Sequence, residues 1–526
     1  SLLFKTAPSE FFINKFQIAA SGHSLDRRLT ITSDVINGEI NGSYSFETII
    51  PSLMNTFKGY LPALIKATQK EKKTKENNFS LLLTIENTDS ISKTLKLPVT
   101  IVNQSRIVGH YNNKYNKFRV EAFLPGFKVG ASAFESGYMV CDNPTDEIVL
   151  HVKATNFNNK GLKNYLDLSL NAKNDRINSL ISWANNKSKT FKADLSSSTH
   201  FVMQEQEAGP AKLRTEIELN QSPIIVNDSL WQIEPSNIFI ENGRIMIDNF
   251  YAYHDDQFIR LDGDVSKTPT DTLKLDLKDV ELSYIFDIVN IPVLQFGGMA
   301  TGTFNLNDLY GSRVLNTDLE IENFSFNKVP FGKLNLYSEW DDQQQGIMML
   351  GSIYKNDSTW TDINGFIYPV GEKSGLSLYF DANDIDISFL QPFMQNIAKN
   401  IKGSGFGNVH LFGPFSKLTV EGEALIKDGG LGIDYLNTYY TFTDSIHLTP
   451  ETIRVKDLTL YDKDGNKGKV NGEVNHQFFR DFNFKATVQA DNMLLYNATP
   501  RQNPQISGTA YGSGSATIQG NEQLIN

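Results

Sequence analysis

The acidic segment DKDGN at residues 462–466 has side chains that could bind Ca²⁺. A calcium loop of this type needs further oxygen ligands and a bidentate Glu near its end, between two helices. Here Val470, Gly472 and Val474 alternate directly after the segment, which is typical of a strand. We therefore interpret residues 462–466 as a hairpin turn, and no metal site is predicted.

The glycine pattern Gly403-x-Gly405-x-Gly407 has the spacing of a phosphate-binding loop. Such a loop holds its anion at the N-terminus of a helix. Val409 and Leu411 instead continue the segment with strand alternation. The pattern therefore predicts close backbone packing or a β-bulge.

The other residues that could do chemistry stand alone. The acidic pairs at 255–256 and 341–342 are interpreted as solvated turns. His410 and His476 have no His, Cys or Glu at metal-ligand spacing, and Cys141 has no His close in sequence. We therefore expect no catalytic residue, no metal and no cofactor, and the chain is not predicted to be an enzyme.

Charge and length narrow the function further. Lys plus Arg is 49 and Asp plus Glu is 60, so the net charge is 49 − 60 = −11. That balance argues against a nucleic-acid partner and against flat docking on anionic lipid, which both require clustered basic residues. A single cysteine excludes an intramolecular disulfide. The 526 residues suggest three or four domains.

Apolar and polar residues alternate along most of the chain. This period of two gives each strand one apolar and one polar face. Asn-Gly and Asp-Gly pairs, which suit tight hairpins, separate many of these runs. The sequence predicts an all-β fold, an elongated antiparallel curled β-sheet with a few short helices. The clearest runs are Leu95/Leu97/Val99/Ile101, Phe118/Val120/Ala122/Leu124, Ile148/Leu150/Val152/Ala154, Leu273/Leu275/Leu277, Leu376/Leu378/Phe380/Ala382 and Phe482/Phe484/Ala486/Val488. The turn pairs are Asn37-Gly38, Asn41-Gly42, Asn242-Gly243, Asp262-Gly263, Asp428-Gly429 and Asp464-Gly465.

Helical spacing of apolar residues is confined to three segments. Residues 48–68 form the clearest one, in which Pro62 is expected to kink or end the helix. Residues 388–401 form a second, with Ser388 as N-cap. Residues 175–184 are a weaker candidate. These helices are expected to plug or cap the sheet.

The second half of the chain contains an internal sequence repeat. Residues 279–285 (DVELSYI) match residues 384–390 (DIDISFL) at an offset of 105. A degenerate copy lies 105 residues earlier, and a shorter one, which includes Gly514, lies 107 or 108 residues later. Repeats of this kind gain stability by continuing their neighbours. The same offset relates Gly298 to Gly403, Gly302 to Gly407, Leu306 to Leu411, Leu315 to Val420 and Ile321 to Ile426.

From these patterns we expect four regions along the chain. Residues 1–75 hold N-terminal strands, an amphipathic helix and a basic linker, and residues 76–270 hold sheet repeats. Residues 271–402 form a sheet repeat with a capping helix, and residues 403–526 a C-terminal β region.

The apolar face of such a sheet must be covered, and periodicity leaves two solutions open. A second sheet would fill a sandwich core, whereas a sheet curled along its length would leave an apolar trough. Twelve alternating apolar residues are the candidates for lining a trough: Leu376, Leu378, Phe380, Val409, Leu411, Leu418, Val420, Ile453, Val455, Phe482, Phe484 and Val488.

The ends of the chain carry no signal-peptide pattern, and the first residue is Ser1. The longest uncharged stretch, residues 288–307, contains Pro292 and several glycines. It is interpreted as two strands and a turn instead of a membrane helix. The chain as given is expected to be soluble, and any membrane anchor is expected to lie outside it.

The region from Gly403 onward contains a set of spaced motifs: Gly403-x-Gly405-x-Gly407, Gly413, Gly422-Glu423, Asp434-Tyr435-Leu436-Asn437, Asp462-x-x-Gly465-Asn466, Gly472, His476 and Gly508-Thr509-Ala510-Tyr511. With these motifs the region resembles the C-terminal conserved region of the TamB family, in the form found in Bacteroidota. The segment at residues 33–68 looks like the upstream region of the same family.

The resemblance implies a place and a task. TamB-like proteins are anchored in the inner membrane, span the periplasm as a curled β-sheet with an apolar lumen, and meet an Omp85-type outer-membrane barrel. They are linked to phospholipid transport and to outer-membrane biogenesis. The resulting hypothesis is a hydrophobic groove for phospholipid acyl chains. The alternatives are an assembly factor for outer-membrane β-barrel proteins that acts by strand addition, and a passive structural β-rod.

Overall fold

The computed structural model describes most of the chain, and its described residues form two compact units. Unit 1 comprises residues 1–255 and 261–264, and unit 2 comprises residues 256–260 and 265–526. The described residues are 2–6, 9–23, 26–65, 75–130, 132–157, 163–185, 191–206, 209–226, 228–283, 296–356, 359–369, 374–394, 398–433, 436–478, 480–502 and 505–521.

Unit 1 contains two helices and the first nineteen strands. They are β1 (Leu2–Thr6), β2 (Ser9–Ile13), β3 (Phe16–His23), β4 (Asp26–Ser33), β5 (Ile36–Ser43), α1 (Ile49–Lys58), β6 (Asn78–Ile85), α2 (Asp89–Leu95), β7 (Val99–Ile101), β8 (Ser105–Asn112), β9 (Lys117–Val129), β10 (Ser132–Asp142), β11 (Ile148–Phe157), β12 (Lys163–Lys173), β13 (Arg176–Asn185), β14 (Phe191–Gln204), β15 (Lys212–Leu219), β16 (Ser222–Val226), β17 (Ser229–Ile233), β18 (Ser236–Glu241) and β19 (Arg244–His254). Strand β20 (Gln257–Val265) has residues in both units.

In its described ranges, unit 2 contains the later strands, and the helical segments η1 and α4 lie between two of them. They are β21 (Thr272–Glu281), β22 (Phe296–Asn307), β23 (Val314–Phe326), β24 (Val329–Asp341), β25 (Gly346–Asn356), β26 (Thr359–Tyr368), β27 (Gly375–Asp386), the 3₁₀ turn η1 (Ile387–Leu390), α4 (Gln391–Met394), β28 (Lys399–Pro414), β29 (Thr419–Ile433), β30 (Thr438–Leu448), β31 (Thr452–Tyr461), β32 (Lys467–Gln477), β33 (Arg480–Ala498) and β34 (Gly508–Asn521).

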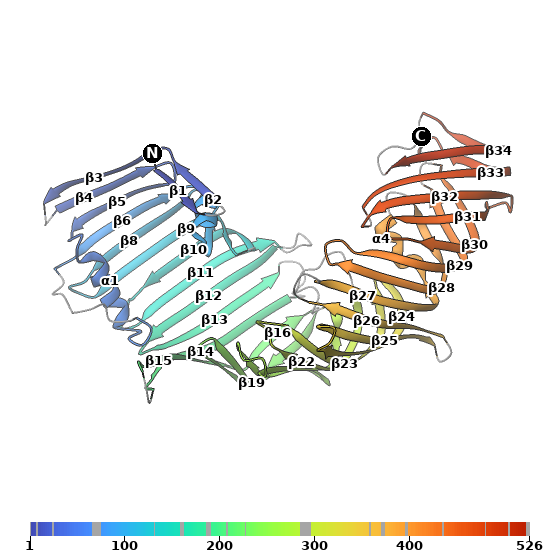
Figure 1. Cartoon of the computed structure of the whole chain (residues 1–526). Helices are drawn as coiled ribbons and strands as arrows, with labels where there is room; N and C mark the ends of the chain where they lie inside the picture. Colours follow the sequence, from blue (N-terminus) through green and yellow to red (C-terminus); the bar gives the residue numbers. More distant parts are fainter. Residues whose placement is uncertain are drawn as a thin grey trace. The chain divides into compact units, whose positions relative to one another are not determined.

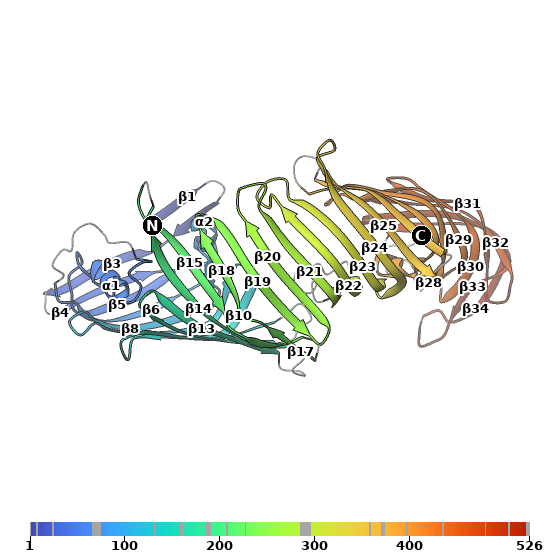
Figure 2. The ribbon, with the colours of Figure 1, turned by 90° about the horizontal axis from the view of Figure 1, so that it is seen from below.

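Within each unit the strands form a long, curled, antiparallel sheet (Figures 1 and 2). In unit 1, neighbours follow the chain from β3 to β14, except that β8 rather than β7 lies beside β6. In unit 2, each strand from β21 to β34 pairs with the next one. The predicted all-β, antiparallel fold class is confirmed.

The repeat with an offset of 105 is also present in the structure. Asp279 and Asp384 both have positive φ angles, 50° and 63°, and both sit where the register of their strand shifts. Gly302 and Gly407, with φ angles of 146° and 131°, lie opposite these strands. Each copy therefore bulges and bends at the same point, and β-bulges increase the local twist of a sheet.

Several predicted hairpin turns lie inside strands instead. Asn242-Gly243 and Asp464-Gly465 do connect strands, as predicted. Asn37-Gly38 and Asn41-Gly42 lie within β5, Asp262-Gly263 within β20, and Asp428-Gly429 within β29. A Cβ atom on Gly42 would come 2.3 Å from the carbonyl oxygen of Asn78 on the next strand. At this position the glycine serves close strand approach, not a turn.

Two helix predictions, at 48–68 and 175–184, and one strand prediction, at Leu95 and Leu97, need correction. Helix α1 ends at Lys58, before Pro62, so it is shorter than the predicted 48–68, of which residues 66–68 lie outside the described residues. Residues 176–185 form strand β13, because Asn174 and Asp175 take positive φ angles and close a tight hairpin from β12. The expected strand around Leu95 and Leu97 is helix α2 and its C-terminal turn, and only β7 is extended.

The predicted helix at 388–401 is a short helical plug. It consists of η1 and α4, and β28 already begins at Lys399. The cap is Asp386, whose Oδ1 accepts a hydrogen bond from the Ser388 backbone N–H at 2.8 Å, so Ser388 is not the N-cap. Residues 395–397 lie outside the described residues.

The predicted strand pair at 288–307 and the predicted regions can be placed on this fold. The second half of residues 288–307 is strand β22, and residues 288–295 lie outside the described residues. The predicted boundary at 270/271 is close to the division between the two units. The boundary at 402/403 lies within β28.

Candidate functional site

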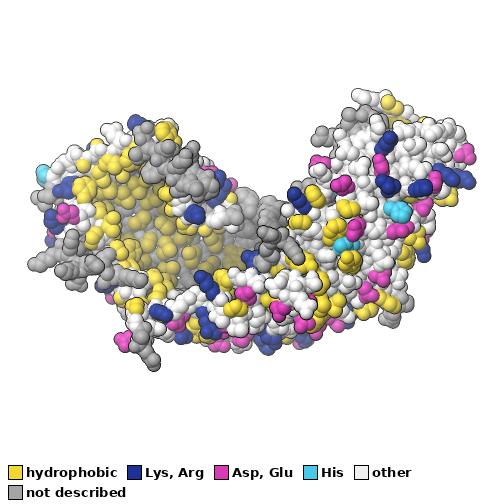
Figure 3. Space-filling view, viewed as in Figure 1, with side chains coloured by type: hydrophobic (Ala, Val, Ile, Leu, Met, Phe, Trp, Pro, Cys, Tyr) yellow, Lys and Arg dark blue, Asp and Glu magenta, His cyan; other side chains and the backbone are white. Residues whose placement is uncertain are grey.

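The inner face of the unit 1 sheet is a continuous apolar surface. One row of directly paired residues crosses eight strands, and all of its members except Ala122 are partly exposed. Figure 3 shows the hollowed face of this unit covered by hydrophobic side chains. The row, which we call the unit 1 apolar row, consists of Leu83, Ile107, Ala122, Met139, Val152, Leu168, Ile181 and Leu195.

The outer face of the same strands carries charged side chains. Residues that alternate with the apolar row include Lys153, Asp167 and Asp194, and Lys153 forms an ion pair with Asp167 at 3.2 Å. Leu168 and Ser169 therefore point to opposite faces of β12, as neighbours in a strand must. The outer face also bears exposed Phe123, Tyr138 and Leu180, so the concave side of the unit 1 sheet is the more uniformly apolar of the two.

Helix α1 covers one margin of this concave face (Figure 1). Its partly buried Ile49, Leu53 and Phe57 pack on a cluster at the strand ends. That cluster contains Tyr44, Tyr60, Leu61, Phe79, Tyr111, Phe118, Ile148 and Ala172. At the opposite strand ends, β7 contributes Ile101 to a second cluster with Phe127 and Ala154. Both margins of the face are thus packed, whereas the apolar row between them is partly exposed.

A buried polar network holds α1 in place. Asn77 donates hydrogen bonds from its side-chain amide to Thr48 Oγ1 at 3.1 Å and to Ser52 Oγ at 2.6 Å. The hydroxyls of Thr56 and Tyr111 lie 3.0 Å apart. Burial raises the pKa of the Tyr111 hydroxyl. These bonds satisfy the polar side of a helix that would otherwise be solvated.

In unit 2, the candidate lining residues share one face of the sheet, except for Leu418. Leu378 pairs with Leu411 and Phe380 with Val409, and the same face continues through Ile453 to Phe484. Leu418 lies in the turn before β29. Val420 is 8% exposed, and the others on strands are partly exposed: Leu376, Leu378, Phe380, Val409, Leu411, Ile453, Val455, Phe482, Phe484 and Val488.

The helical plug covers part of this face. Ile387, Ala398 and Ile401 form a buried cluster with Ile426 and Phe442. Val455 and Val488, which were predicted to line the trough, pack against this cluster. The inner face of unit 2 is therefore covered near the plug, unlike the apolar row of unit 1.

Unit 1 was not included among the predicted lining residues. The signal was available, because Leu166, Leu168 and Leu170 alternate as clearly as the residues chosen in unit 2.

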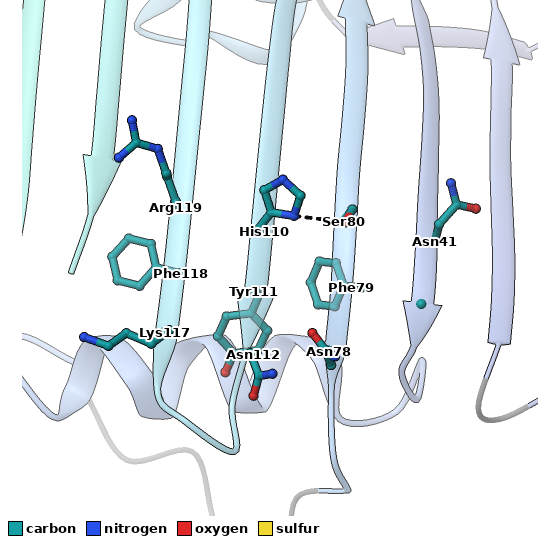
Figure 4. Close-up of a pocket in the computed structure, with 11 residues that line it drawn as sticks. Asn41, Asn78, Phe79, Ser80, His110, Tyr111, Asn112, Lys117, Phe118 and Arg119 are labelled. Atoms are coloured by element: carbon teal, nitrogen blue, oxygen red, sulfur yellow. Dashed lines mark hydrogen bonds between the residues drawn. The ribbon is translucent and has the colours of Figure 1, made fainter. Parts of the chain in front are cut away.

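Residues that could catalyse a reaction occur as ordinary cross-strand contacts. Unit 1 has an open depression of about 380 Å³. Ser80 Oγ lies 3.0 Å from His110 Nδ1 among its lining residues, and Figure 4 marks this contact with a dashed line. The same contact recurs between Ser169 and His151 at 3.0 Å. In the depression, Arg119 is engaged by Glu121 and Asp142 instead of facing a ligand. A pattern that recurs as strand pairing is explained by the sheet alone.

The segment at 462–466 is a hairpin turn between β31 and β32, as predicted. Asp462 Oδ1 accepts hydrogen bonds from the backbone N–H groups of Asp464 and Asn466, both at 2.9 Å. Its Oδ2 accepts one from the Leu494 N–H at 2.7 Å. Within the described ranges, no group of three or more His, Cys, Asp or Glu residues could hold a metal ion.

Cys141, the single cysteine of the sequence, is partly buried. This burial raises the pKa of its thiol.

Comparisons with known proteins do not identify the chain. No family model, curated protein or solved structure matches it. Over the part of the chain that the structure describes, no helix is both long and apolar enough to cross a membrane. The resemblance to the TamB family therefore stands on the motif residues alone.

Proposed function

We propose that this protein carries phospholipid acyl chains along the concave apolar face of its sheet, while the headgroups remain in water. The observation that carries the proposal is the partial exposure of the unit 1 apolar row between two packed margins. A second layer packed on the row would bury these side chains, as it does in a sandwich core. The row has room for apolar ligand atoms.

The energetics favour such a task. Exposing one sixteen-carbon chain to water costs roughly 13 kcal/mol, at about 0.8 kcal/mol per methylene. A continuous apolar surface removes most of that cost at each position. Because the row contains Leu, Ile, Val and Met rather than a deep pocket, no single position binds tightly, which permits movement.

The resemblance to the TamB family supplies the remaining parts of the proposal. The lipid would pass between the inner and outer membranes through the periplasm. An anchor outside this chain would hold the protein in the inner membrane. At the outer membrane, the protein would contact an Omp85-type barrel.

Lipid capture by a matched pair of variants tests the proposal. Leu168→Asp places a charge on the apolar row, and Ser169→Asp places the same charge on the outer face of the same strand. We expect phospholipid to co-purify with the wild type and with Ser169→Asp, measured by native mass spectrometry and lipid extraction. Leu168→Asp should lose most of it while keeping the wild-type circular dichroism spectrum. Equal lipid content in the two variants, or no lipid on the wild type, would contradict the proposal.

A further inference from the structure

The outer face of unit 2 carries exposed rings on both sides of a polar row. On one side, Tyr337, Leu350, Asn364, Tyr379 and His410 lie opposite one another on successive strands β24 to β28. On the other side, Tyr354 pairs with Trp360. Between the two, the paired residues are all polar: Asn335, Ser352, Asp362 and Asp381.

The tyrosine and tryptophan rings of this surface are open to solvent, whereas the His410 side chain is 14% exposed. Tyr337 is 43% exposed, Trp360 44% and Tyr379 50%. Tyr337, Leu350 and Tyr354 line an open depression of about 310 Å³ together with Asn335, Ser352 and Asp362. Large exposed side chains gathered around a depression indicate an interaction surface.

Hydrogen bonds and stacking hold the rings in position. Trp360 donates from its indole Nε1 to Asp362 Oδ2 at 3.2 Å, and Ser352 Oγ donates to the other oxygen of Asp362 at 2.6 Å. His410 stacks on Tyr379 with 4.0 Å between ring centroids and an interplanar angle of 3°. Rings fixed in this way lose little conformational entropy when a ligand binds.

The spacing across the surface suits a chain of rings. Neighbouring strands are about 4.8 Å apart, and residues four apart along a strand are about 13 Å apart. The polar floor thus has one side chain on each of strands β24 to β27, and its repeat across the strands is close to the length of one pyranose residue. The rings flank this floor at intervals and do not occur on every strand.

We propose that this surface binds an uncharged polysaccharide whose chain runs across strands β24 to β28. A pyranose has apolar C–H faces, which pack on aromatic rings, and hydroxyl groups, which the Asn, Ser and Asp side chains of the floor can bind. Asp318, Asp362 and Asp381 give the surface an acidic character that disfavours phosphate-rich or carboxylate-rich polymers. A protein partner fits less well, because the centre of a protein interface is apolar and depleted of charge.

Titration with oligosaccharides tests the proposal. The probes are hexasaccharides of glucose and of N-acetylglucosamine, and the measurements are calorimetry and the fluorescence of Trp360, one of four tryptophans. We expect saturable binding of at least one probe and a change in emission that Trp360→Phe removes. Tyr337→Ala and Tyr354→Ala should each weaken binding about tenfold.

The controls separate this surface from the rest of the molecule. Tyr165→Ala removes an equally exposed tyrosine from unit 1 and should bind as the wild type does. Leu168→Asp should also bind normally, because the lipid face is a different surface. The proposal is wrong if neither probe binds at millimolar concentration, if the Tyr337 and Tyr354 variants bind like the wild type, or if anionic polymers or peptides bind better than the neutral probes.

Discussion

The side-chain amide of Asn143 donates a hydrogen bond to the hydroxyl of Tyr60 at 2.8 Å, across 83 residues of sequence. Tyr60 is 4% exposed and Asn143 1%. Tyr60 follows helix α1, and Asn143 lies in the connection between β10 and β11. This bond therefore attaches the end of the helix to the margin of the concave sheet.

Removing this bond should weaken unit 1. Tyr60→Phe leaves the buried amino group of Asn143 with one acceptor fewer, because its other bond goes to the Asn116 carbonyl, and Asn143 Oδ1 accepts from the Phe118 N–H. An unsatisfied buried donor costs roughly 1–3 kcal/mol. We expect a loss of this size in the free energy of unfolding, measured by urea denaturation. Tyr115→Phe, at an exposed tyrosine, should change it little, and a similar loss in both variants would contradict the assignment.

The repeated glycines should be intolerant of a methyl group. A Cβ atom at Gly302 would lie 2.0 Å from the Asp318 carbonyl oxygen, and one at Gly407 would lie 2.3 Å from that of Glu423. Both residues also have positive φ angles. We expect each Gly→Ala variant to lose roughly 1–3 kcal/mol. Gly472→Ala is the control, because its nearest neighbour would be 3.4 Å away, and thermal unfolding of all three should separate it from the other two.

The turn at Asp462 should make unit 2 sensitive to acid. Burial alone would raise the pKa of Asp462, but hydrogen bonds from Leu494, Asn466 and Asp464 outweigh burial and lower it. A lowered pKa gives stability that is present above the ordinary carboxyl pKa of about 3.9 and is lost as the pH falls through the folded-state value. Asp462→Asn should therefore lose less stability than the wild type between neutral pH and the acid range. If the free energy of unfolding depended on pH in the same way in the wild type and in Asp462→Asn, Asp462 would not be the source of the acid sensitivity.

Charges on the inner face of unit 2 should reduce lipid binding there. Phe380→Asp and Phe484→Asp place carboxylates among partly exposed apolar residues, where an acyl chain would lie. Asn383→Asp and Asn483→Asp place the same charge on the opposite face of the same strands. We expect the two Phe variants, but not the Asn variants, to retain less lipid in the same extraction assay. If all four variants retained equally little lipid, the loss would not depend on which face of the sheet carries the charge, and the prediction would be wrong.

The local pattern of the chain predicted much of this architecture. Alternation at Phe118–Leu124 and Ile148–Ala154 gives the strands, and hairpin-length connections require them to be antiparallel. The repeat between residues 279–285 and 384–390 predicted matching units, because similar local sequences, each beginning with an Asp, form the same bulge. The amphipathic character of each strand is likewise a property of neighbouring residues.

The covering of the apolar face was decided by the tertiary structure. Alternation at Leu168 and at Val455 is the same, yet Leu168 lies in a partly exposed row, and Val455 packs against the helical plug. The difference depends on residues far away in sequence: α1 is tied to Asn77 and Asn143, and Ile387 of η1 packs with Ile426 and Phe442. The alternation within a strand determines which of its two faces is apolar. The curvature of the sheet and the distant segments packed on it determine whether that face is covered by protein or left partly exposed.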